Sequence, residues 1–290
     1  MKDKERNSYK HDYNDLSVSM LKERDDYETI LKAQPNEILP NIAKKTIISI
    51  IGSTNSGKSV FINSLVYKWY YDLFDYIVLI SPSAKNDRSM WSFRNDPKCI
   101  IFEEYSDSII EEIENIQKVE SDEEYQDQPL MLMIFDDCAN KNGCSKYDSR
   151  ISQLATRHRH LGINLVFSIQ VYKQLSHPIR NNTKAFIIKQ NPNMNELLKM
   201  AEELAFCVGG KNNFLNLYHQ VITKDKYGFL YLDVVNQKAY DGFDNLLWSE
   251  ETHGTAVFDV KRNNFDSKNK ELTIEEKQEE EKTKLIPRCR

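Results

Sequence analysis

The sequence lacks a long apolar run. No stretch approaches the roughly 18 consecutive apolar residues that a membrane-spanning helix needs. The first twenty residues, MKDKERNSYKHDYNDLSVSM, are heavily charged and do not fit the apolar core of a secretory signal. These absences argue against a membrane span and lead us to expect a soluble, unsecreted protein with no membrane partner.

Cysteine pairs and net positive charge are also missing. The five cysteines contain no C-x-x-C pair, so the sequence predicts reduced thiols in a cytosolic compartment rather than a disulfide framework. The gaps between Cys138, Cys144, His158 and His160 do not match the usual spacing of zinc ligands. The net charge of −5 argues against a broad basic surface that coats nucleic acid, so any contact with DNA has to be local.

Glycine is scarce, with nine residues in the chain, yet two of them bracket the most informative stretch. This stretch, Gly52-Ser53-Thr54-Asn55-Ser56-Gly57-Lys58-Ser59, matches the phosphate-binding pattern G-x-x-x-x-G-K-[S/T] at every fixed position. An apolar, β-branched run at 46–51 precedes it, and a helical pattern at 60–67 follows it. Strand, glycine loop and helix occur in the order that the motif requires, which predicts a site for a nucleoside triphosphate.

Each part of the stretch has a physical role. The glycines let the backbone turn tightly with its N–H groups pointing inward, and the helix N-terminus adds about half a positive charge. The main chain can therefore hold a polyphosphate. Lys58 would reach the β- and γ-phosphates, and the Ser59 hydroxyl would bind Mg²⁺.

The second informative stretch is an apolar run at 130–137 that ends in two acids, Asp136 and Asp137. A carboxylate at a strand end can orient Mg²⁺ directly or through water, and we assign this role to Asp136. Successive side chains of an extended chain face opposite sides, so Asp137 can point to an attacking water as general base or water-orienting group. Two solvated aspartates at a strand end are the alternative interpretation.

Further polar side chains are candidates for contacting the γ-phosphate. Gln170 ends an apolar run and fits a sensor that bonds the phosphate or the water, although a packed, helix-capping glutamine would give the same pattern. Arg157 and Arg159 lie in a helix-like segment, and a guanidinium that reaches a neighbour's γ-phosphate can accelerate hydrolysis about 10³- to 10⁵-fold. Two arginines on an exposed face explain the pattern equally well. Arg180 is a further candidate.

The alternation of apolar runs and helical patterns predicts an α/β fold with a mostly parallel sheet flanked by helices. Further strands are expected at 76–81, 99–102, 185–188 and, as an edge strand, 228–233, and further helices at 107–118, 195–207 and 214–222. Composition divides the chain into a charged helical arm at 1–35, a phosphate-loop domain at 36–250 and a charged, disordered tail at 251–290.

In this order the motifs resemble the FtsK and HerA branch of the additional-strand P-loop ATPases, and most closely the genome-packaging ATPases of poxviruses, other large DNA viruses and virophages. The resemblance covers 45–235, and its more specific parts are Ile134-Phe135-Asp136-Asp137-Cys138, Arg157-His158-Arg159-His160 and Ile169-Gln170. It implies ATP as the nucleotide, with Arg157 or Arg159 as a finger that acts in trans. Cellular translocases of this type look to have Glu where this chain has Asp137, whose side chain is one methylene shorter, which implies a closer water or slower turnover.

The resemblance further implies an ATPase that threads double-stranded DNA through a homo-oligomeric ring, a hexamer in this family, and fills a capsid, with capsid proteins as additional partners. The host cytoplasm, in a viral factory, and the virion are the implied locations. Two alternatives stay open: a nucleotide-gated scaffold for capsid assembly with little turnover, and a HerA-like DNA translocase or helicase unrelated to packaging. A GTPase is disfavoured because Asn140-Lys141-Asn142-Gly143 lacks the aspartate of the guanine-reading N-K-x-D pattern.

Overall fold

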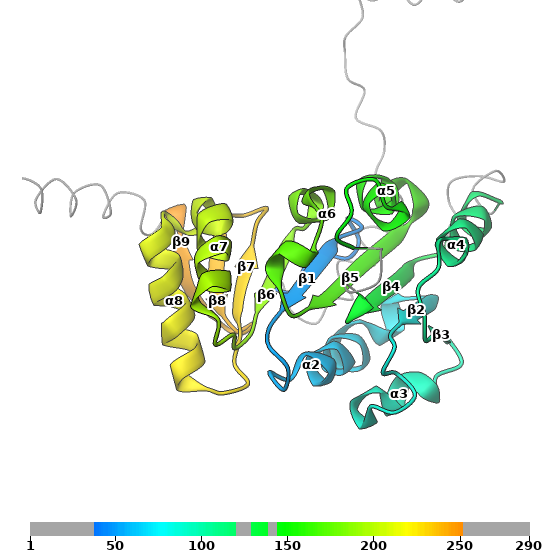
Figure 1. Ribbon diagram of the computed structural model, residues 1–290, viewed down its shortest axis with the longest axis horizontal. Helices are drawn as coiled ribbons and strands as arrows, with labels where there is room; N and C mark the ends of the chain where they lie inside the picture. The colour runs from blue at the N-terminus through cyan, green and yellow to red at the C-terminus, as the bar shows by residue number, and fades with distance from the viewer. Residues whose placement is uncertain (1–37, 120–128, 139–143, 252–290) are drawn as a thin grey trace, which may run out of the picture.

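The computed structural model describes residues 38–119, 129–138 and 144–251, which form one nine-stranded sheet with strand order β3-β2-β4-β5-β1-β6-β7-β8-β9 (Figure 1). The strands are β1 (Ile47–Ile51), β2 (Tyr76–Ile80), β3 (Cys99–Phe102), β4 (Met131–Asp136), β5 (Ile163–Ile169), β6 (Ala185–Ile188), β7 (Leu230–Asp233), β8 (Lys238–Asp241) and β9 (Asn245–Ser249). The strands β1 to β6 pair in parallel. The predicted mostly parallel α/β sheet is confirmed.

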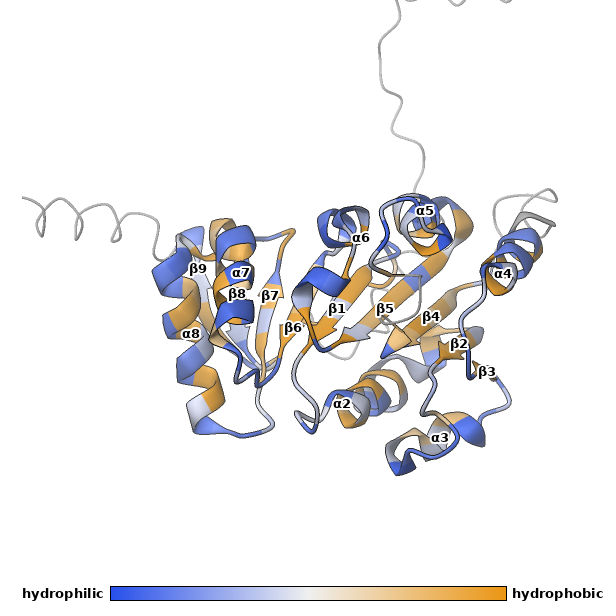
Figure 2. Cartoon of the chain, in the orientation of Figure 1, coloured by the Kyte–Doolittle hydropathy of each residue, from blue (hydrophilic) through white to orange (hydrophobic). Residues whose placement is uncertain are grey.

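Helices cover both faces of this sheet (Figure 1). The α-helices are α2 (Lys58–Ser64), α3 (Trp91–Arg94), α4 (Asp107–Val119), α5 (Arg150–Arg157), α6 (His177–Asn182), α7 (Met194–Leu204) and α8 (Lys211–Lys224). One apolar cluster packs α4 to α8 against one face, and a second packs α2 and α3 against the other. Figure 2 shows the apolar strands between these two layers. Burial on both faces explains why the parallel strands read as continuous apolar runs.

The strand that precedes the phosphate loop lies inside the sheet. Every residue of β1 is buried. Ile48 pairs with Val166 of β5 on one side and with Ala185 of β6 on the other. The strand β5 therefore lies between β1 and the acid-ended strand β4, which is the arrangement of the additional-strand class. A loop that leaves β1 starts from a support that is held on both edges and both faces.

The antiparallel end of the sheet differs from the prediction. The segment 228–233 was expected to be an edge strand, but β7 pairs with β6 on one side and with β8 on the other. The edge strand at this end is β9. The prediction was wrong because β8 and β9 are short, with only two and three consecutive apolar residues, so they lack the longer apolar run by which the parallel strands were found.

Other boundaries agree to within a few residues. The predictions at 99–102 and 185–188 coincide with β3 and β6, while the helix after the phosphate loop starts earlier, at Lys58, and continues as a π-helix over Leu65–Tyr70. The predicted arm at 1–35 lies outside the described residues, as does the tail beyond Glu251, so the domain boundaries stay a prediction. Within the described ranges, no helix combines the length and apolar character needed to cross a membrane.

His158 gives the fold a pH-dependent stability. Its side chain is buried, and Nδ1–H donates to the carbonyl oxygen of Ile163 at 2.8 Å. Burial lowers the pKa of His158 to about 4, whereas histidine in an unfolded chain titrates near 6.5. Because the unfolded state binds the proton first, the free energy of unfolding should fall as the pH drops from 6.5 to 4, by roughly 3 kcal/mol from this group.

The His158→Gln variant tests this expectation, since it removes the titrating group and keeps a polar side chain. Urea unfolding of both proteins between pH 7.5 and pH 4 measures the difference in slope, and carboxylates that titrate in both proteins cancel in the comparison. An identical pH dependence in the two proteins would show that His158 does not titrate as its burial implies.

Candidate nucleotide-binding site

The phosphate loop passes through left-handed backbone conformations. Asn55 has a φ of 63° and Gly57 a φ of 81°. Gly57 is therefore required by its backbone conformation. Gly52 is required by packing, because a Cβ there would lie 2.5 Å from Oγ of Ser56 and 2.9 Å from Cβ of Lys189. The two glycines of the motif thus serve different purposes.

Neighbouring strands hold the loop in place. The N–H of Gly52 donates to the carbonyl oxygen of Ile169, at the end of β5, over 3.2 Å. The N–H and the hydroxyl of Ser53 both donate to the carbonyl oxygen of Gln190, just beyond β6, each at 3.0 Å. The strands on either side of β1 therefore fix the start of the loop.

Lys58 begins α2, and its side chain lies within the loop. Nζ donates to the carbonyl oxygens of Gly52 at 2.9 Å and Ser53 at 3.0 Å. Burial lowers the pKa of Lys58, and the nearby carboxylates of Asp136 and Asp137 oppose that shift. The structure thus brings the motif lysine and the two strand-end acids into one electrostatic neighbourhood.

Asp136 is the last residue of β4 and is 3% exposed. Burial raises the pKa of its carboxyl group, and the hydroxyl of Ser81, which donates to Oδ2 at 3.1 Å, offsets part of the shift. A carboxylate buried to this extent needs a cation or further donors to stay ionised. This is the behaviour expected of a group that acts beside a metal ion.

Asp137 reaches the same cavity by a different route from the one we expected. The strand ends at Asp136, and Asp137 has a φ of 52°, so it is not on extended backbone. Its N–H donates to the carbonyl oxygen of Ser168 at 3.0 Å. The left-handed conformation, rather than strand alternation, directs the second carboxylate, and both aspartates line one cavity.

Gln170 follows the last residue of β5 and bridges the loop and the second aspartate. Its Nε2 lies 3.3 Å from both Oδ1 and Oδ2 of Asp137, and its Oε1 accepts from the hydroxyl of Thr54 at 3.2 Å. The expectation that Gln170 ends a strand close to the γ-phosphate position fits this placement. The side chain is not a helix cap, because its partners are in the cavity.

The cavity has a volume of about 630 Å³ and lies at the carboxyl ends of β1, β2, β4 and β5, which is where parallel sheets bind ligands. It is lined by Thr54, Asn55, Gly57, Lys58, Ser59, Val60, Ser83, Asp87, Ser89, Asp136, Asp137, Gln170, Lys226 and Tyr227. Six of these residues were not assigned to the site from the sequence: Ser83, Asp87, Ser89, Lys226, Tyr227 and Val60. The first three follow β2, and that position was the one signal that could have found them.

Asp87 is a third carboxylate of the cavity. Its Oδ1 accepts from the N–H of Ser89 at 2.8 Å and from its hydroxyl at 2.7 Å, and the hydroxyl of Ser59 also donates to it. Burial alone would raise the pKa of Asp87, but the bonds from Ser89 and Ser59 overcome this and lower it. Asp87 is therefore an ionised partner of the hydroxyl that is expected to meet Mg²⁺.

Basic and aromatic residues alternate in the loop that follows β2, a composition that can contact nucleic acid. Arg94 is engaged inside the protein, since Nη1 donates to the carbonyl oxygens of Ala84, Lys85 and Asp87 at 2.7, 2.8 and 3.0 Å. Trp91 is 63% exposed. Arg94 thus shapes the loop beside the cavity, and only the exposed residues around it stay open to a partner.

The candidate arginines of the trans finger lie away from this cavity. Arg157 ends α5, and its Nη2 is 2.5 Å from Oε1 of Glu114, a buried carboxylate that also pairs with Arg150 at 2.8 Å. Arg159 is exposed in the 3₁₀ turn His158–Leu161. Because this turn precedes β5, both arginines are at the amino edge of the parallel sheet, opposite the phosphate loop. Neither can serve the site of its own chain.

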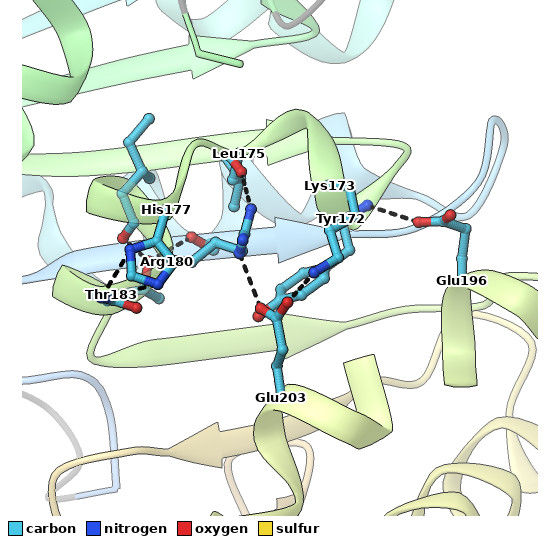
Figure 3. Close-up of polar contacts among 11 residues, drawn as sticks. Tyr172, Lys173, Leu175, His177, Arg180, Thr183, Glu196 and Glu203 are labelled. Carbon is cyan, nitrogen blue, oxygen red and sulfur yellow. Dashed lines mark hydrogen bonds and ion pairs between the residues drawn. The ribbon is translucent and has the colours of Figure 1, made fainter. Parts of the chain in front are cut away.

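Arg180 is also outside the phosphate cavity. It comes from α6, and its Nε lies 2.9 Å from Oε2 of Glu203 while its Nη1 donates to the carbonyl oxygen of Leu175 (Figure 3). Its guanidinium carbon is 5.4 Å from the ring centroid of Tyr172. Lys173 pairs with the same Glu203. Arg180 therefore links α6 to α7 rather than reaching a phosphate in its own chain.

The donor set at the base of the cavity fits Mg²⁺. The Ser59 hydroxyl and the Asp136 carboxylate are hard oxygen ligands, and both line the cavity. In the part of the chain that the structure describes, no three His, Cys, Asp or Glu residues are grouped to hold a metal ion by themselves. Mg²⁺ is usually bound by one or two protein groups, substrate phosphates and water.

Strand order and site together define a P-loop NTPase fold of the additional-strand class: the loop follows a central parallel strand, and a further strand separates it from the acid-ended strand. The family model of the Poxvirus A32 protein matches residues 41–206, which contain the loop, both aspartates and Gln170. The chain belongs to this family. The resemblance to viral genome-packaging ATPases that the motifs suggested is therefore confirmed.

A solved structure supports the fold. The genome packaging NTPase B204 from Sulfolobus turreted icosahedral virus 2, in complex with AMP, matches with a TM-score of 0.51 and 15% identity, over 69% of this chain and 97% of that chain. Its complex with ATP-gammaS has a TM-score of 0.49 and 18% identity, over 69% and 97% of the two chains. No curated protein matches the chain.

Proposed function

We propose that this chain is an ATPase that uses hydrolysis to move double-stranded DNA into a viral capsid. The observation that carries the proposal is the meeting of Lys58, Asp136, Asp137 and Gln170 in one cavity of a Poxvirus A32 family protein. The solved B204 protein, which has the same fold, is described as a genome packaging NTPase. ATP and Mg²⁺ are the proposed cofactors.

In this proposal the phosphate loop binds the triphosphate through backbone N–H groups, and Lys58 places a positive charge on the β- and γ-phosphates. Ser59 and Asp136 would hold Mg²⁺. The ion, when bound, neutralises charge on the phosphate oxygens. The loop is well suited to this because its start is fixed to the strands on both sides, so little ordering is needed when the nucleotide enters.

Asp137 accepts a proton from the attacking water, whose oxygen forms a bond to the γ-phosphorus. The bond from that phosphorus to the β,γ-bridging oxygen breaks, and ADP and phosphate are the products. Gln170 holds Asp137 through its amide, with Nε2 3.3 Å from both carboxylate oxygens. An exchange of this contact for one to the γ-phosphate would let Gln170 report the state of the nucleotide to β5.

The ring, the capsid partners and the location in the viral factory or virion belong to the same proposal. Arg159 is better suited than Arg157 to act in trans, because Arg157 is held by the buried Glu114 while Arg159 is exposed. A finger at the amino edge of the sheet requires a neighbouring chain to complete the site. This can be tested by mixing Arg159→Ala chains with wild-type chains and measuring ATP hydrolysis. If Arg159 acts across subunits, the activity should fall more steeply than the fraction of wild-type chains.

Steady-state ATP hydrolysis with and without linear double-stranded DNA tests the function. We expect Mg²⁺-dependent turnover that DNA stimulates several-fold, because a translocase couples its cycle to the strand that it moves. Turnover that ignores DNA would contradict the translocase and favour the alternative of a nucleotide-gated capsid scaffold. Stimulation by DNA without any effect of the protein on packaging into capsids would favour the HerA-like alternative.

A further inference from the structure

The turn between α8 and β7 lies against the phosphate loop, although no motif pointed to it. Tyr227, in this turn, is 57% exposed and lines the phosphate cavity together with Gly57, Val60 and Lys226. It comes from a segment about 170 positions beyond the loop in the chain. A large aromatic side chain is thus exposed at the mouth of a phosphate-binding site.

Three hydrogen bonds hold the backbone of this turn. The N–H of Tyr227 donates to Oδ1 of Asp225 at 2.9 Å, and the N–H of Gly228 donates to the carbonyl oxygen of Asp225 at 3.0 Å. Nζ of Lys189 donates to the carbonyl oxygen of Tyr227 at 2.8 Å. The Tyr227 ring is therefore presented from a fixed backbone, and Lys189 ties that backbone to the end of β6.

Lys189 is an unusual support because its side chain is almost completely buried, at 2% exposed. Its ammonium lies 5.4 Å from the ring centroid of Phe61, on α2, and 5.3 Å from that of Phe229. The same lysine packs under the loop, with its Cβ 2.9 Å from where a Cβ of Gly52 would lie. One residue thus couples the phosphate loop, its helix and the tyrosine turn.

The contact between ring and loop is edge-on. A Cβ on Gly57 would lie 3.2 Å from Cδ1 and 3.9 Å from Cε1 of Tyr227, and these two atoms belong to one edge of the ring. Val60, which is 60% exposed, lies one turn further along α2 and lines the same mouth. Nζ of Lys226 is 5.4 Å from the Tyr227 centroid. The mouth therefore combines an aromatic ring, an aliphatic side chain and a cation.

We propose that Tyr227 and Val60 form the base-binding part of the nucleotide site, with the nucleobase stacked on the Tyr227 ring. This inference rests on the proposed nucleotide-binding function and adds the contacts to the base. A nucleobase is planar and largely apolar on its faces, and stacking on an aromatic side chain strengthens binding without requiring hydrogen bonds to the base. The occupant is fixed by position, because the base belongs to the same molecule whose phosphates the adjoining loop binds.

Two ligands that differ in the base separate this role from any effect on the loop. The full chain is titrated calorimetrically with a hydrolysis-resistant β,γ-methylene analogue of ATP and with inorganic tripolyphosphate, both with Mg²⁺. Tyr227→Ala should weaken the binding of the nucleotide analogue about 5- to 150-fold and change the affinity for tripolyphosphate less than twofold. Tyr227→Phe should retain the wild-type affinity for both ligands, because the ring is kept.

The matched control is Tyr76→Ala, an exposed tyrosine at the amino end of β2, which should leave both affinities unchanged. If Tyr227→Ala lowered the affinity for both ligands equally, the proposal would be overturned, since the residue would then act on the loop. An unchanged affinity for the nucleotide analogue would overturn it too. A wild-type chain that binds the analogue but does not hydrolyse ATP would contradict the proposed ATPase and leave the base contact supported, so the two failures are distinguishable.

Discussion

Replacing Lys58 with alanine should lower the rate of ATP hydrolysis by at least about 100-fold. The ammonium is the cationic side chain within the phosphate loop, where it contacts the carbonyl oxygens of Gly52 and Ser53 and is partly buried beside two carboxylates. A charge in such a site interacts with phosphate more strongly than one in water. Its removal also leaves the carbonyl oxygens of Gly52 and Ser53 without their donor beside the anionic phosphates, so the affinity for ATP should fall together with kcat.

The matched control for this change is Lys68→Ala, an exposed lysine further along the same helical segment. It removes the same charge from the chain and should keep wild-type turnover. Steady-state phosphate release measures both variants, and thermal unfolding shows whether the Lys58→Ala chain is folded. A folded Lys58→Ala protein that retains more than a tenth of wild-type turnover would contradict the role of Lys58 in binding the phosphates.

Asp137→Asn should slow hydrolysis while ATP binding is retained, with kcat reduced about 10²- to 10⁴-fold. Asparagine removes the proton-accepting carboxylate but keeps the shape of the side chain. It also tolerates the left-handed backbone at this position, where φ is 52°. One acceptor for Nε2 of Gln170 is preserved, so the geometry of the cavity should survive.

The comparison with Asp136→Asn makes this test specific. The Asp136 carboxylate is assigned to the metal, so its loss should weaken the binding of ATP with Mg²⁺, whereas Asp137→Asn should leave that affinity close to wild type. Single-turnover hydrolysis and calorimetric binding separate the two outcomes. Asp148→Asn, at an exposed aspartate before α5, is the surface control. Wild-type turnover in Asp137→Asn would exclude the residue as general base.

Much of the parallel sheet could be predicted, because strands buried on both faces leave an unmistakable apolar run. The runs Ile47–Ile51 and Met131–Asp136 are examples: the phosphate loop follows the first, and the second ends in Asp136. The short strands β8 and β9 could not be predicted in the same way. Pairing with β7 stabilises β8, and β9 is stabilised by pairing with β8 and by the packing of Trp248, which is buried against Gly209 in its left-handed conformation. None of these contacts is visible in local composition.

The site, too, could be predicted only in part from the sequence. Lys58, Asp136 and Gln170 could be assigned because a loop or strand end defines their positions. Asp137 was assigned to the right cavity with the wrong reason, since its direction comes from a left-handed backbone that the sequence pattern does not reveal. Tyr227 could not be found at all, because its place beside Gly57 depends on how α8 packs and where the chain returns to the sheet.

The strand β5 connects the candidate trans arginine, Arg159, with the candidate sensor, Gln170. Its seven residues span about 23 Å at 3.3 Å each, with Arg159 four residues before its first residue, in the preceding 3₁₀ turn, and Gln170 directly after its last. Hydrogen bonds to β1 and β4 hold it along both edges, so it cannot slide or bend independently of its neighbours. In the proposed function, a displacement of the backbone at Gln170 therefore reaches Arg159 as a rigid-body movement of the sheet.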